Sequence, residues 1–495
     1  MPALAAGMWK NEWRNGVMQA QSLRRLAVAV AASSLLLLST AGSFAVSASS
    51  GMWVITSSTT LTEDYAGSIL IETDGVTLDC AGHTVFGPDS GDLNGGISVH
   101  WATGVTVRNC IVSGFSLHGM YSFDTTGLRL VHNTVIGNGL AGIVLDTVAG
   151  ATIAGNRLTG NGDNGLVLWR TSETRVTNNI VRDNTSVGIV LVGTTGATVE
   201  SNASIGNGVG FTAGSSSGNS FTSNSASNSS GPGFWFLEGS QRNVVRGNSA
   251  SHNGGGFFLE GADGTQVIGN TASHNRADGF AVDGTTSGVV RGNRSIANQD
   301  SGFTFRGSGD LRITDNVAKD NGPDGGNGFL FLATSGLRVE DNTAVGSPWA
   351  CFGLYDGTHG ATLVGNKASG CSAGFDLGSG SYDNTLRGNT ANGNANGNGF
   401  SLGDGATANV LSGNTANGNA NGFLVFGVTG NTLSDNTANT NAGYGFVADG
   451  GATANTFSHN AAHQNDRSHT DCLDALDTGS GNTWIRNHFG TSSGI

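Results

Sequence analysis

The segment GFAVDGTTSGVVRGNRSIAN, residues 279–298, shows the repeating unit from which most of this chain is built. Phe280 and Val282 alternate on one short strand, Val289 lies on a second, and residues 295–297 form a third. Asn293 stands in a tight turn, where Asn tolerates left-handed backbone. Each strand is too short to bury a core alone, so it must pair with the equivalent strand of the next unit.

One asparagine marks the period of the repeat. It occurs at 17 positions between Asn109 and Asn487, with a mean spacing of 23.6 residues, and a second asparagine follows five residues later in most units. A fixed period of this length is typical of solenoids. In register, each amide could donate to one neighbouring coil and accept from the other. We therefore predict an all-β chain, a parallel β-helix of about 17 coils with irregular N- and C-terminal caps.

A leucine-rich repeat is the alternative for this period, since it also carries an asparagine in units of similar length. It needs several leucines per unit and often a helix. The units here are rich in Gly, Thr, Ser and Val, and no helical period survives in them. The parallel β-helix is therefore preferred.

Composition limits the function. Of 495 residues 81 are glycine, and only 12% are charged, about half of the usual ~25%. The net charge is −13. An acidic chain with few lysines repels phosphate backbones, which excludes nucleic acid as the expected partner.

Residues 1–48 are predicted to be a signal peptide, with Met18 as an alternative start. Arg24 and Arg25 precede a mostly apolar run over residues 26–38, and small residues follow up to Ala48. The run is shorter than the ~20 residues of a membrane span. We expect a secreted, periplasmic or cell-surface protein with a single domain over residues 49–495. We also expect no membrane span after signal removal, and a monomer.

The five cysteines are Cys80, Cys110, Cys351, Cys371 and Cys472. The first two lie about one coil apart, as do the next two, so each pair could sit in neighbouring coils. An exported compartment permits disulfides, but the spacing leaves open whether either bridge forms. No CxxC spacing supports a zinc site.

The segments GVTLDCAGHTVFG (75–87) and GVTVRNCIVSGF (104–115), followed by repeated GI-x-L…V-x-GN-x-A units, resemble a known group. They are similar to right-handed parallel β-helix proteins of the pectin lyase-like superfamily, and within it to NosD-like repeat proteins. The resemblance covers about residues 51–495. It implies the fold, while its members include polysaccharide lyases, hydrolases, epimerases and non-enzymatic proteins.

Signatures of particular activities in these relatives are missing. The DPHD motif of mannuronan epimerases is absent, since the nearest stretch, YDGTHG (355–360), lacks its proline and second aspartate. No match to the calcium and arginine motifs of pectate lyases is found. NosD-like proteins are linked to copper delivery for nitrous oxide reductase, yet nothing in the repeats resembles a Cys/His/Met copper site.

The resemblance implies a substrate groove on the outer face of the first strand of each coil. Counting ten residues back from each ladder asparagine places Glu238, Glu260 and Asp283 on three successive coils, with Arg306 next. These four are the candidate catalytic residues. Their repulsion must be offset by Arg306, by protonation or by a bound cation, for which calcium is the candidate. The alternative is a solvated rim in which Arg306 pairs with Asp283.

Three aromatic residues are candidate substrate-binding residues for the same face. Trp169, Trp235 and Phe258 could stack on sugar rings, although Trp235 lies where the spacing lengthens, so a buried, bulge-filling side chain is the alternative. A second group is dense in possible metal ligands but matches no known spacing. It comprises His459, His463, Asp466, His469, Asp471, Cys472 and His488.

Two functions follow as hypotheses. In the first, the protein binds or processes a polysaccharide along the outer face of its first strands; if it is an enzyme, it is a polysaccharide lyase or a glycoside hydrolase. In the second it is a non-catalytic periplasmic or surface scaffold, NosD-like and linked to metal delivery, because the turns are short and uniform and wall no deep cleft.

Overall fold

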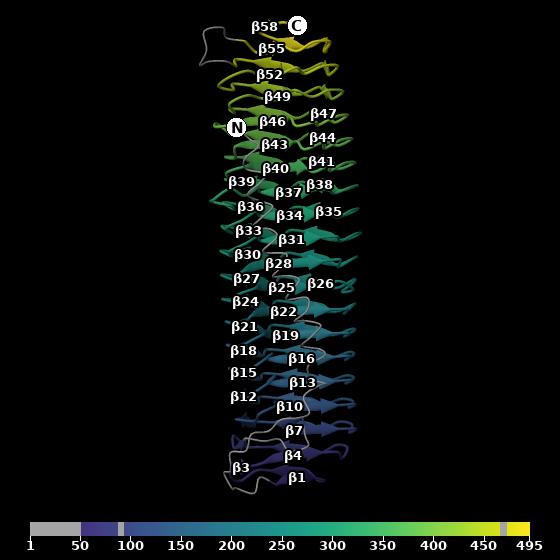
Figure 1. Cartoon of the computed structure of the whole chain (residues 1–495), viewed down its shortest axis with the longest axis vertical. Coiled ribbons are helices and arrows are strands. Elements are labelled where there is room, and N and C mark those ends of the chain that lie inside the picture. The colour runs from purple at the N-terminus through teal and green to yellow at the C-terminus, as the bar shows by residue number, and fades with distance from the viewer. Residues whose placement is uncertain (1–50, 88–93, 466–472) are drawn as a thin grey trace, which may run out of the picture. The chain divides into compact units, whose positions relative to one another are not determined.

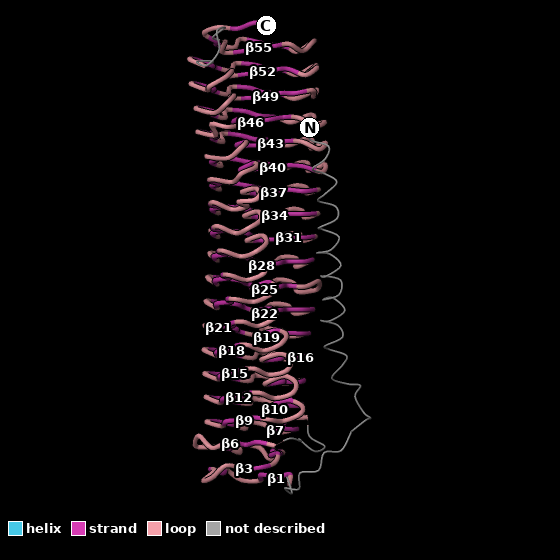
Figure 2. The backbone as a smooth tube through the Cα atoms, turned by 60° about the vertical axis from the view of Figure 1, so that its left-hand side comes forward, coloured by secondary structure: helices cyan, strands magenta, loops and turns pink. Residues whose placement is uncertain are grey.

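A computed structural model describes residues 51–87, 94–465 and 473–495. Its described residues form a stack of coils in which each coil contributes one strand to each of three parallel sheets (Figure 1). Sheet A has 20 strands, and sheets B and C have 19 each among the described residues. Figure 2 shows strands and loops without a helix in the same part of the chain. The predicted parallel β-helix is confirmed, with about 18 turns instead of 17.

Sheet A contains the longest strands and positions the candidate site. In stacking order its strands are β1 (Met52–Ile55), β4 (Ser68–Ile71), β7 (Gly95–His100), β10 (His118–Phe123), β13 (Ile143–Asp146), β16 (Leu166–Trp169), β19 (Val187–Val192), β22 (Val209–Gly214), β25 (Pro232–Phe236), β28 (Gly255–Glu260), β31 (Phe280–Asp283), β34 (Phe303–Arg306), β37 (Phe329–Leu332), β40 (Ala350–Tyr355), β43 (Ala373–Leu377), β46 (Asn398–Leu402), β49 (Phe423–Phe426), β52 (Phe446–Asp449), β55 (Ala475–Asp477) and β58 (Ser492–Ser493).

Sheets B and C are built mainly from three-residue strands. In the coil of residues 279–298, β32 (Val289–Arg291) belongs to sheet B and β33 (Arg294–Ile296) to sheet C. Only the middle residue of such a strand points inward, as Val290 and Ser295 do. In this coil β33 begins after a turn of only two residues from the end of β32. Each of the two strands pairs with its equivalent in the next coil.

Buried asparagine ladders join the coils at the turns. Asn270 Nδ2 donates to Asn293 Oδ1 at 3.0 Å and to Val245 O at 2.8 Å, while Asn270 Oδ1 accepts from the backbone and side-chain nitrogens of Asn248 at 2.8 and 3.0 Å. The second predicted ladder is also present, as in the bond from Asn275 Nδ2 to Asn298 Oδ1. A third ladder, which was not predicted, lies between sheets A and B; it includes Asn384, Asn409, Asn431, Asn455 and Asn482.

A continuous stack of phenylalanine rings fills the core beneath sheet A from β22 to β52. Neighbouring ring centroids lie 4.7–4.8 Å apart, with planes 2–8° from parallel, which matches the spacing of strands in a sheet. The stack holds Phe211, Phe234, Phe257, Phe280, Phe303, Phe329, Phe352, Phe375, Phe400, Phe423 and Phe446. Each coil is therefore held in register by one large buried side chain as well as by its amides.

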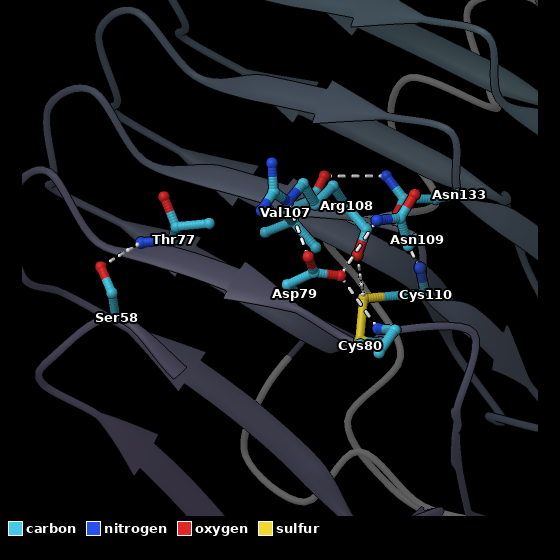
Figure 3. A network of polar contacts seen from close by, with 10 residues as sticks. Ser58, Thr77, Asp79, Cys80, Val107, Arg108, Asn109, Cys110 and Asn133 are labelled. Atoms are coloured by element: carbon cyan, nitrogen blue, oxygen red, sulfur yellow. Dashed lines mark hydrogen bonds and ion pairs between the residues drawn. A yellow bond between two sulfur atoms is a disulfide. The ribbon is translucent and has the colours of Figure 1, made fainter. Parts of the chain in front are cut away.

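Near the N-terminal end of the stack, Cys110 and not the predicted Asn109 stands in the asparagine column, since the Cys110 backbone N–H donates to Asn133 Oδ1 at 3.0 Å (Figure 3). Asn109 is the left-handed residue before it, with a φ of 55°. Asp79 Oδ1 accepts from Asn109 Nδ2 at 3.0 Å, and Asp79 Oδ2 lies 2.9 Å from Arg108 Nε. These contacts, with the Asn109 amide first, lower the pKa of Asp79. Cys80 and Cys110 form a disulfide beside them, and Cys351 and Cys371 form another, so both candidate bridges are present. Cys472 lies outside the described residues.

Two further predictions concern the ends and the membrane. The signal segment over residues 1–48 lies outside the described residues. Within the part of the chain that the structure describes, no helix is long and apolar enough to cross a membrane.

Removing one ladder amide should destabilise the stack. Asn270 is fully buried, and Asn270→Ala leaves Val245 O and the Asn248 backbone N–H without their partners. We expect the free energy of unfolding to fall by roughly 2–4 kcal/mol, since each unsatisfied buried group costs about 1–3 kcal/mol. Chemical denaturation of parent and variant measures the loss. Asn396→Ala, at an exposed turn position, is the control and should change little. Equal stabilities of the Asn270 variant and the parent would contradict the role of the ladder.

Candidate functional site

Groups with shifted pKa values gather on the outer face of sheet A and in the turns that lead into it. Ten described groups have a pKa shifted chiefly by burial, and nine of them lie there: His100, His118, Tyr121, Asp163, Asp278, Asp283, Asp300, Tyr355 and Asp376. The exception is Tyr65 in β3 (Tyr65–Ala66) of sheet C. Such clustering is a physical signature of functional sites.

The structure confirms part of the predicted acidic column. Glu260, Asp283 and Arg306 are in register on β28, β31 and β34 and lie on the outer face. Leu332 follows Arg306. Arg306 Nη1 lies 3.4 Å from Asp283 Oδ1, so the predicted alternative of an ion pair is also present.

Glu238 does not occupy this column, and the prediction that it stacks with Glu260 is wrong. Phe236 pairs with Leu259, which places Leu237 in register with Glu260. Glu238 is exposed in the turn after β25, where Gly239, with a φ of 81°, adds one residue to the turn. Because the extra residue follows the strand, counting ten residues back from Asn248 stops at Glu238, one position short of Leu237.

The central acidic cluster consists of Glu260, Asp278, Asp283, Asp300 and Arg306. The pKa of Asp283 is raised, chiefly by burial and also by Glu260, while Arg306 opposes the rise. The pKa of Asp278 is raised well above its usual range by burial and by the neighbouring Asp300. Burial also raises the pKa of Asp300 itself, although its carboxylate accepts the backbone N–H of Ser301 at 2.9 Å. The Arg306 guanidinium, which pairs with Asp283, thus offsets part of the repulsion among the four carboxyl groups.

Sequence reasoning missed Asp278 and Asp300. Each precedes the glycine that opens a sheet A strand, in ADGF (277–280) and QDSGF (299–303). Asp278 stands two residues before Phe280 and Asp300 three residues before Phe303, so no single position counted from the buried phenylalanine finds both. Counting from the phenylalanine does place Leu237 correctly, because turn insertions lie after the strand and leave its own register intact.

The predicted aromatic residues differ in exposure. Trp235 is only 6% exposed, and its Nε1 lies 3.4 Å from Glu260 Oε2, so it supports the acidic cluster and is not an open stacking surface. Phe258 is half-buried and pairs with Trp235 across the coils. Trp169 is half-buried three coils away on β16, at about 14 Å by the usual strand spacing.

A tyrosine–aspartate pair on the same face was also missed. Tyr355 Oη donates to Asp376 Oδ2 at 2.7 Å, and burial together with Asp376 raises the Tyr355 pKa well above its usual range. The Tyr355 ring lies against Gly353, where an added Cβ would come within 2.6 Å of it. The Asp376 pKa is raised by burial as well. The two groups are therefore joined by one short hydrogen bond, in which the tyrosine donates and the carboxylate accepts.

Aromatic and imidazole rings gather at the N-terminal part of sheet A. The His118 ring stacks on Tyr121 with centroids 6.1 Å apart, and His118 Nδ1 accepts from the Ala141 backbone at 3.1 Å. Burial lowers the His118 pKa to about 4. Tyr121 Oη donates to Asp146 Oδ2 at 3.4 Å, and burial raises the Tyr121 pKa to about 12.

The predicted C-terminal ligand group is only partly described. Asp466, His469, Asp471 and Cys472 lie outside the described residues. His463 and His488 approach each other edge-on, with ring centroids 5.5 Å apart, and His459 lies in the preceding turn with a φ of 54°.

Family models match most of the chain. The model described as "Periplasmic copper-binding protein (NosD)" matches residues 48–231 and 324–493. The model described as "Right handed beta helix region" matches residues 187–344, which bridge the gap.

The donor set of the described residues does not fit a copper ion. Copper sites in proteins use imidazole, thiolate or thioether ligands that converge on one point. Within residues 51–87, 94–465 and 473–495, no three His, Cys, Asp or Glu side chains are grouped to hold a metal. The four described cysteines are all in disulfides, and of the two described methionines Met120 is buried and Met52 is exposed on β1, the first strand of the stack. The exposed His252 and His274 stack with rings nearly parallel, so their nitrogens do not converge.

Solved structures with similar folds are distant in sequence. The Azotobacter vinelandii mannuronan C-5 epimerase AlgE6 A-module is 16% identical, with 70% of this chain and 90% of that chain covered and a TM-score of 0.33. The periplasmic alginate epimerase AlgG is 12% identical (76% and 78% covered, TM-score 0.31), and a rhamnogalacturonan lyase is 13% identical (55% and 79% covered, TM-score 0.33). No curated protein matches the chain. No inference about activity follows from likenesses at this level. The two segments matched by the copper-binding model together span well over half of the residues, so the chain belongs to the NosD family of right-handed β-helix proteins.

Proposed function

We propose that this protein is exported and binds a polysaccharide along the outer face of sheet A. The observation that carries the proposal is the row of half-buried carboxyl groups on this one face that contact aromatic or cationic side chains: Tyr121–Asp146, Trp235–Glu260, Arg306–Asp283 and Tyr355–Asp376. The ion pairs on sheet B, such as Arg175–Glu200 and Arg312–Glu340, are more exposed and include no aromatic partner. A long face with carboxyl, hydroxyl and aromatic groups in register suits a repeating ligand, because successive coils can contact successive units.

Cleavage of the polysaccharide is a second proposal, favoured by Asp278 and Asp300. Glycoside hydrolysis uses two carboxyl groups, one protonated to donate to the leaving oxygen and one ionised. Asp278 and Asp300 are the candidate pair of carboxyl groups, because burial raises the pKa of each and Asp300 raises that of Asp278 further. Arg306 and Asp283 lie beside them and would orient a bound sugar.

Only the family match suggests copper binding for this chain, and the side chains of the described residues do not support it. The proposal that the protein is a non-catalytic scaffold differs from the polysaccharide proposal in one respect: a scaffold has no need of glycan affinity. The two are therefore separated by binding measurements.

Affinity electrophoresis with a panel of soluble neutral and uronate glycans tests the function. We expect at least one glycan to retard the parent protein, and Arg306→Ala to weaken the retardation about tenfold, since a buried hydrogen-bonded charge commonly contributes more than 1 kcal/mol. Lys367→Ala, on sheet C, is the matched control. If cleavage occurs, reducing ends should appear with the parent and not with Asp278→Asn, which should still bind. Migration unaffected by every glycan would favour the scaffold.

The elevated pKa of Asp278 also predicts a pH effect on stability. Between about pH 4, where the unfolded carboxyl titrates, and the raised folded pKa, the folded state binds more protons, so stability falls as the pH rises. Asp278→Asn removes this loss. The variant should therefore melt at a higher temperature than the parent at pH 7, and the difference should vanish below pH 4.

Thermal melts from pH 3 to pH 8 measure this effect. The exposed Asp324→Asn is the control and should show no such pH-dependent gain. A parent and an Asp278 variant with parallel profiles would show that Asp278 titrates normally.

Calcium binding by Glu260 and Asp283 remains a proposal with a direct test. The Trp235 indole lies beside Glu260, and Arg306 pairs with Asp283, so both carboxylates already have partners. We therefore expect millimolar calcium to leave the melting temperature unchanged, for the parent and for Glu260→Gln alike. A calcium-dependent rise that Glu260→Gln abolishes would instead establish a calcium site.

A further inference from the structure

Three aromatic side chains form an outward platform near the N-terminal end of sheet A, far from the central acidic cluster. They are Trp101, which directly follows β7, Phe123 on β10 and Trp169 on β16, and they are called the aromatic platform below. Phe123 and Trp169 occupy the same register column, separated by Asp146. The Trp101 and Phe123 rings meet edge to face with centroids 6.1 Å apart.

Burial does not explain why a tryptophan stands at position 101. Its side chain is 61% exposed, and its backbone is left-handed, with a φ of 51°. A bulky residue in this conformation is strained, and such strain is concentrated at functional sites. The equivalent turn position is left-handed in the next three coils as well, where Asp124, Thr147 and Arg170 occupy it, so Trp101 differs from them in being large and apolar. Farther along the stack the position is often a glycine, which takes this conformation without strain: Gly193, Gly261, Gly284, Gly307 and Gly427. A large apolar ring is therefore held in water at a position where glycine would be more stable.

The other members are fixed in place by polar neighbours. The Arg170 guanidinium lies 5.6 Å from the centre of the Trp169 ring, as a cation over an aromatic face. Between Phe123 and Trp169, the Asp146 carboxylate accepts from Tyr121 Oη at 3.4 Å and from Thr147 Oγ1 at 2.9 Å. The platform thus combines aromatic rings with carboxylate acceptors at the same level of the stack.

We infer that the aromatic platform is a binding subsite for uncharged sugar rings of a polysaccharide, an inference that rests on the proposed function. The apolar C–H faces of a pyranose ring pack on the electron-rich faces of Trp and Phe, while its hydroxyls donate to carboxylates such as Asp146. Small-molecule sites combine apolar contact with a few convergent polar groups in this way. The platform lies on the same face as the acidic cluster, so one extended chain can reach both.

Charge decides between neutral and uronate glycans. The platform carries Asp146 and the exposed Asp124, and Arg170 is already stacked on Trp169. Farther along the face four carboxyl groups surround Arg306. The chain as a whole has a net charge of −13. A polyuronate would place one carboxylate per sugar unit next to these negative charges, which would repel it. An uncharged glycan brings only hydroxyl donors and acceptors.

Affinity electrophoresis with hydroxyethyl cellulose, xyloglucan, alginate and polygalacturonate tests the inference on the full chain. We expect the parent to be retarded by a neutral glycan and not by the two uronates. Trp101→Gly and Trp169→Ala should each weaken that retardation at least tenfold. The control Trp349→Ala, which removes a 42% exposed indole from the turn before β40, should leave it unchanged. Trp101→Gly should also melt at the same or a higher temperature than the parent, which separates lost binding from lost folding.

Each outcome has a definite meaning. Retardation of the parent that persists in both platform variants overturns the platform and leaves the proposed function standing. Retardation by uronates alone overturns the assignment to neutral sugars. A parent that no glycan retards overturns the proposed function together with this inference. Sedimentation showing a dimer that Trp101→Gly dissociates would instead identify the platform as a contact between copies, and would overturn the inference.

Discussion

The in-register hydrogen bond between side-chain amides of successive coils is the constraint on which the rest of the structure depends. A three-residue strand gains little stability from pairing alone. The tight turns at its ends also leave buried backbone N–H and C=O groups without a partner in the sheet, where water cannot reach them. Each ladder asparagine satisfies those groups and bonds to the coils on both sides, as the four hydrogen bonds of Asn270 show. Because each amide bonds to its equivalent in the next coil, the ladder permits no slip in register.

Register in turn explains the core and the surface. Inside, it aligns equivalent phenylalanines so closely that their rings stack at the spacing of the strands. Outside, it aligns equivalent polar positions, so that carboxyl groups from separate coils crowd together, and burial and then this crowding raise the pKa of Asp278 and Asp283. The acidic cluster is thus a consequence of the same periodicity that stabilises the fold, and Arg306 relieves part of its repulsion.

The division of sheet A into regions has functional meaning. Its N-terminal part presents aromatic rings, its centre presents carboxyl groups around Arg306, and Tyr355 with Asp376 lies beyond them. No deep cavity is needed for a ligand that extends along the stack, because contacts are distributed over many coils. This arrangement also differs from what the family description implies, since a copper ion requires ligands that converge on one point, and the described residues are spread along a face.

The sequence by itself determined the period, the parallel β-helix, the two main asparagine ladders and the approximate acidic column, because these depend on spacing that is repeated in every unit. It also placed Asp283 and Arg306 correctly, since no insertion separates them from the asparagine used for counting. Only the tertiary structure decided that Leu237 and not Glu238 is in the column, that Trp235 is covered, and that Trp101 is open. The physical reason is that one residue added to a turn shifts every position counted across it, while exposure depends on side chains from the coils above and below, which no single unit contains.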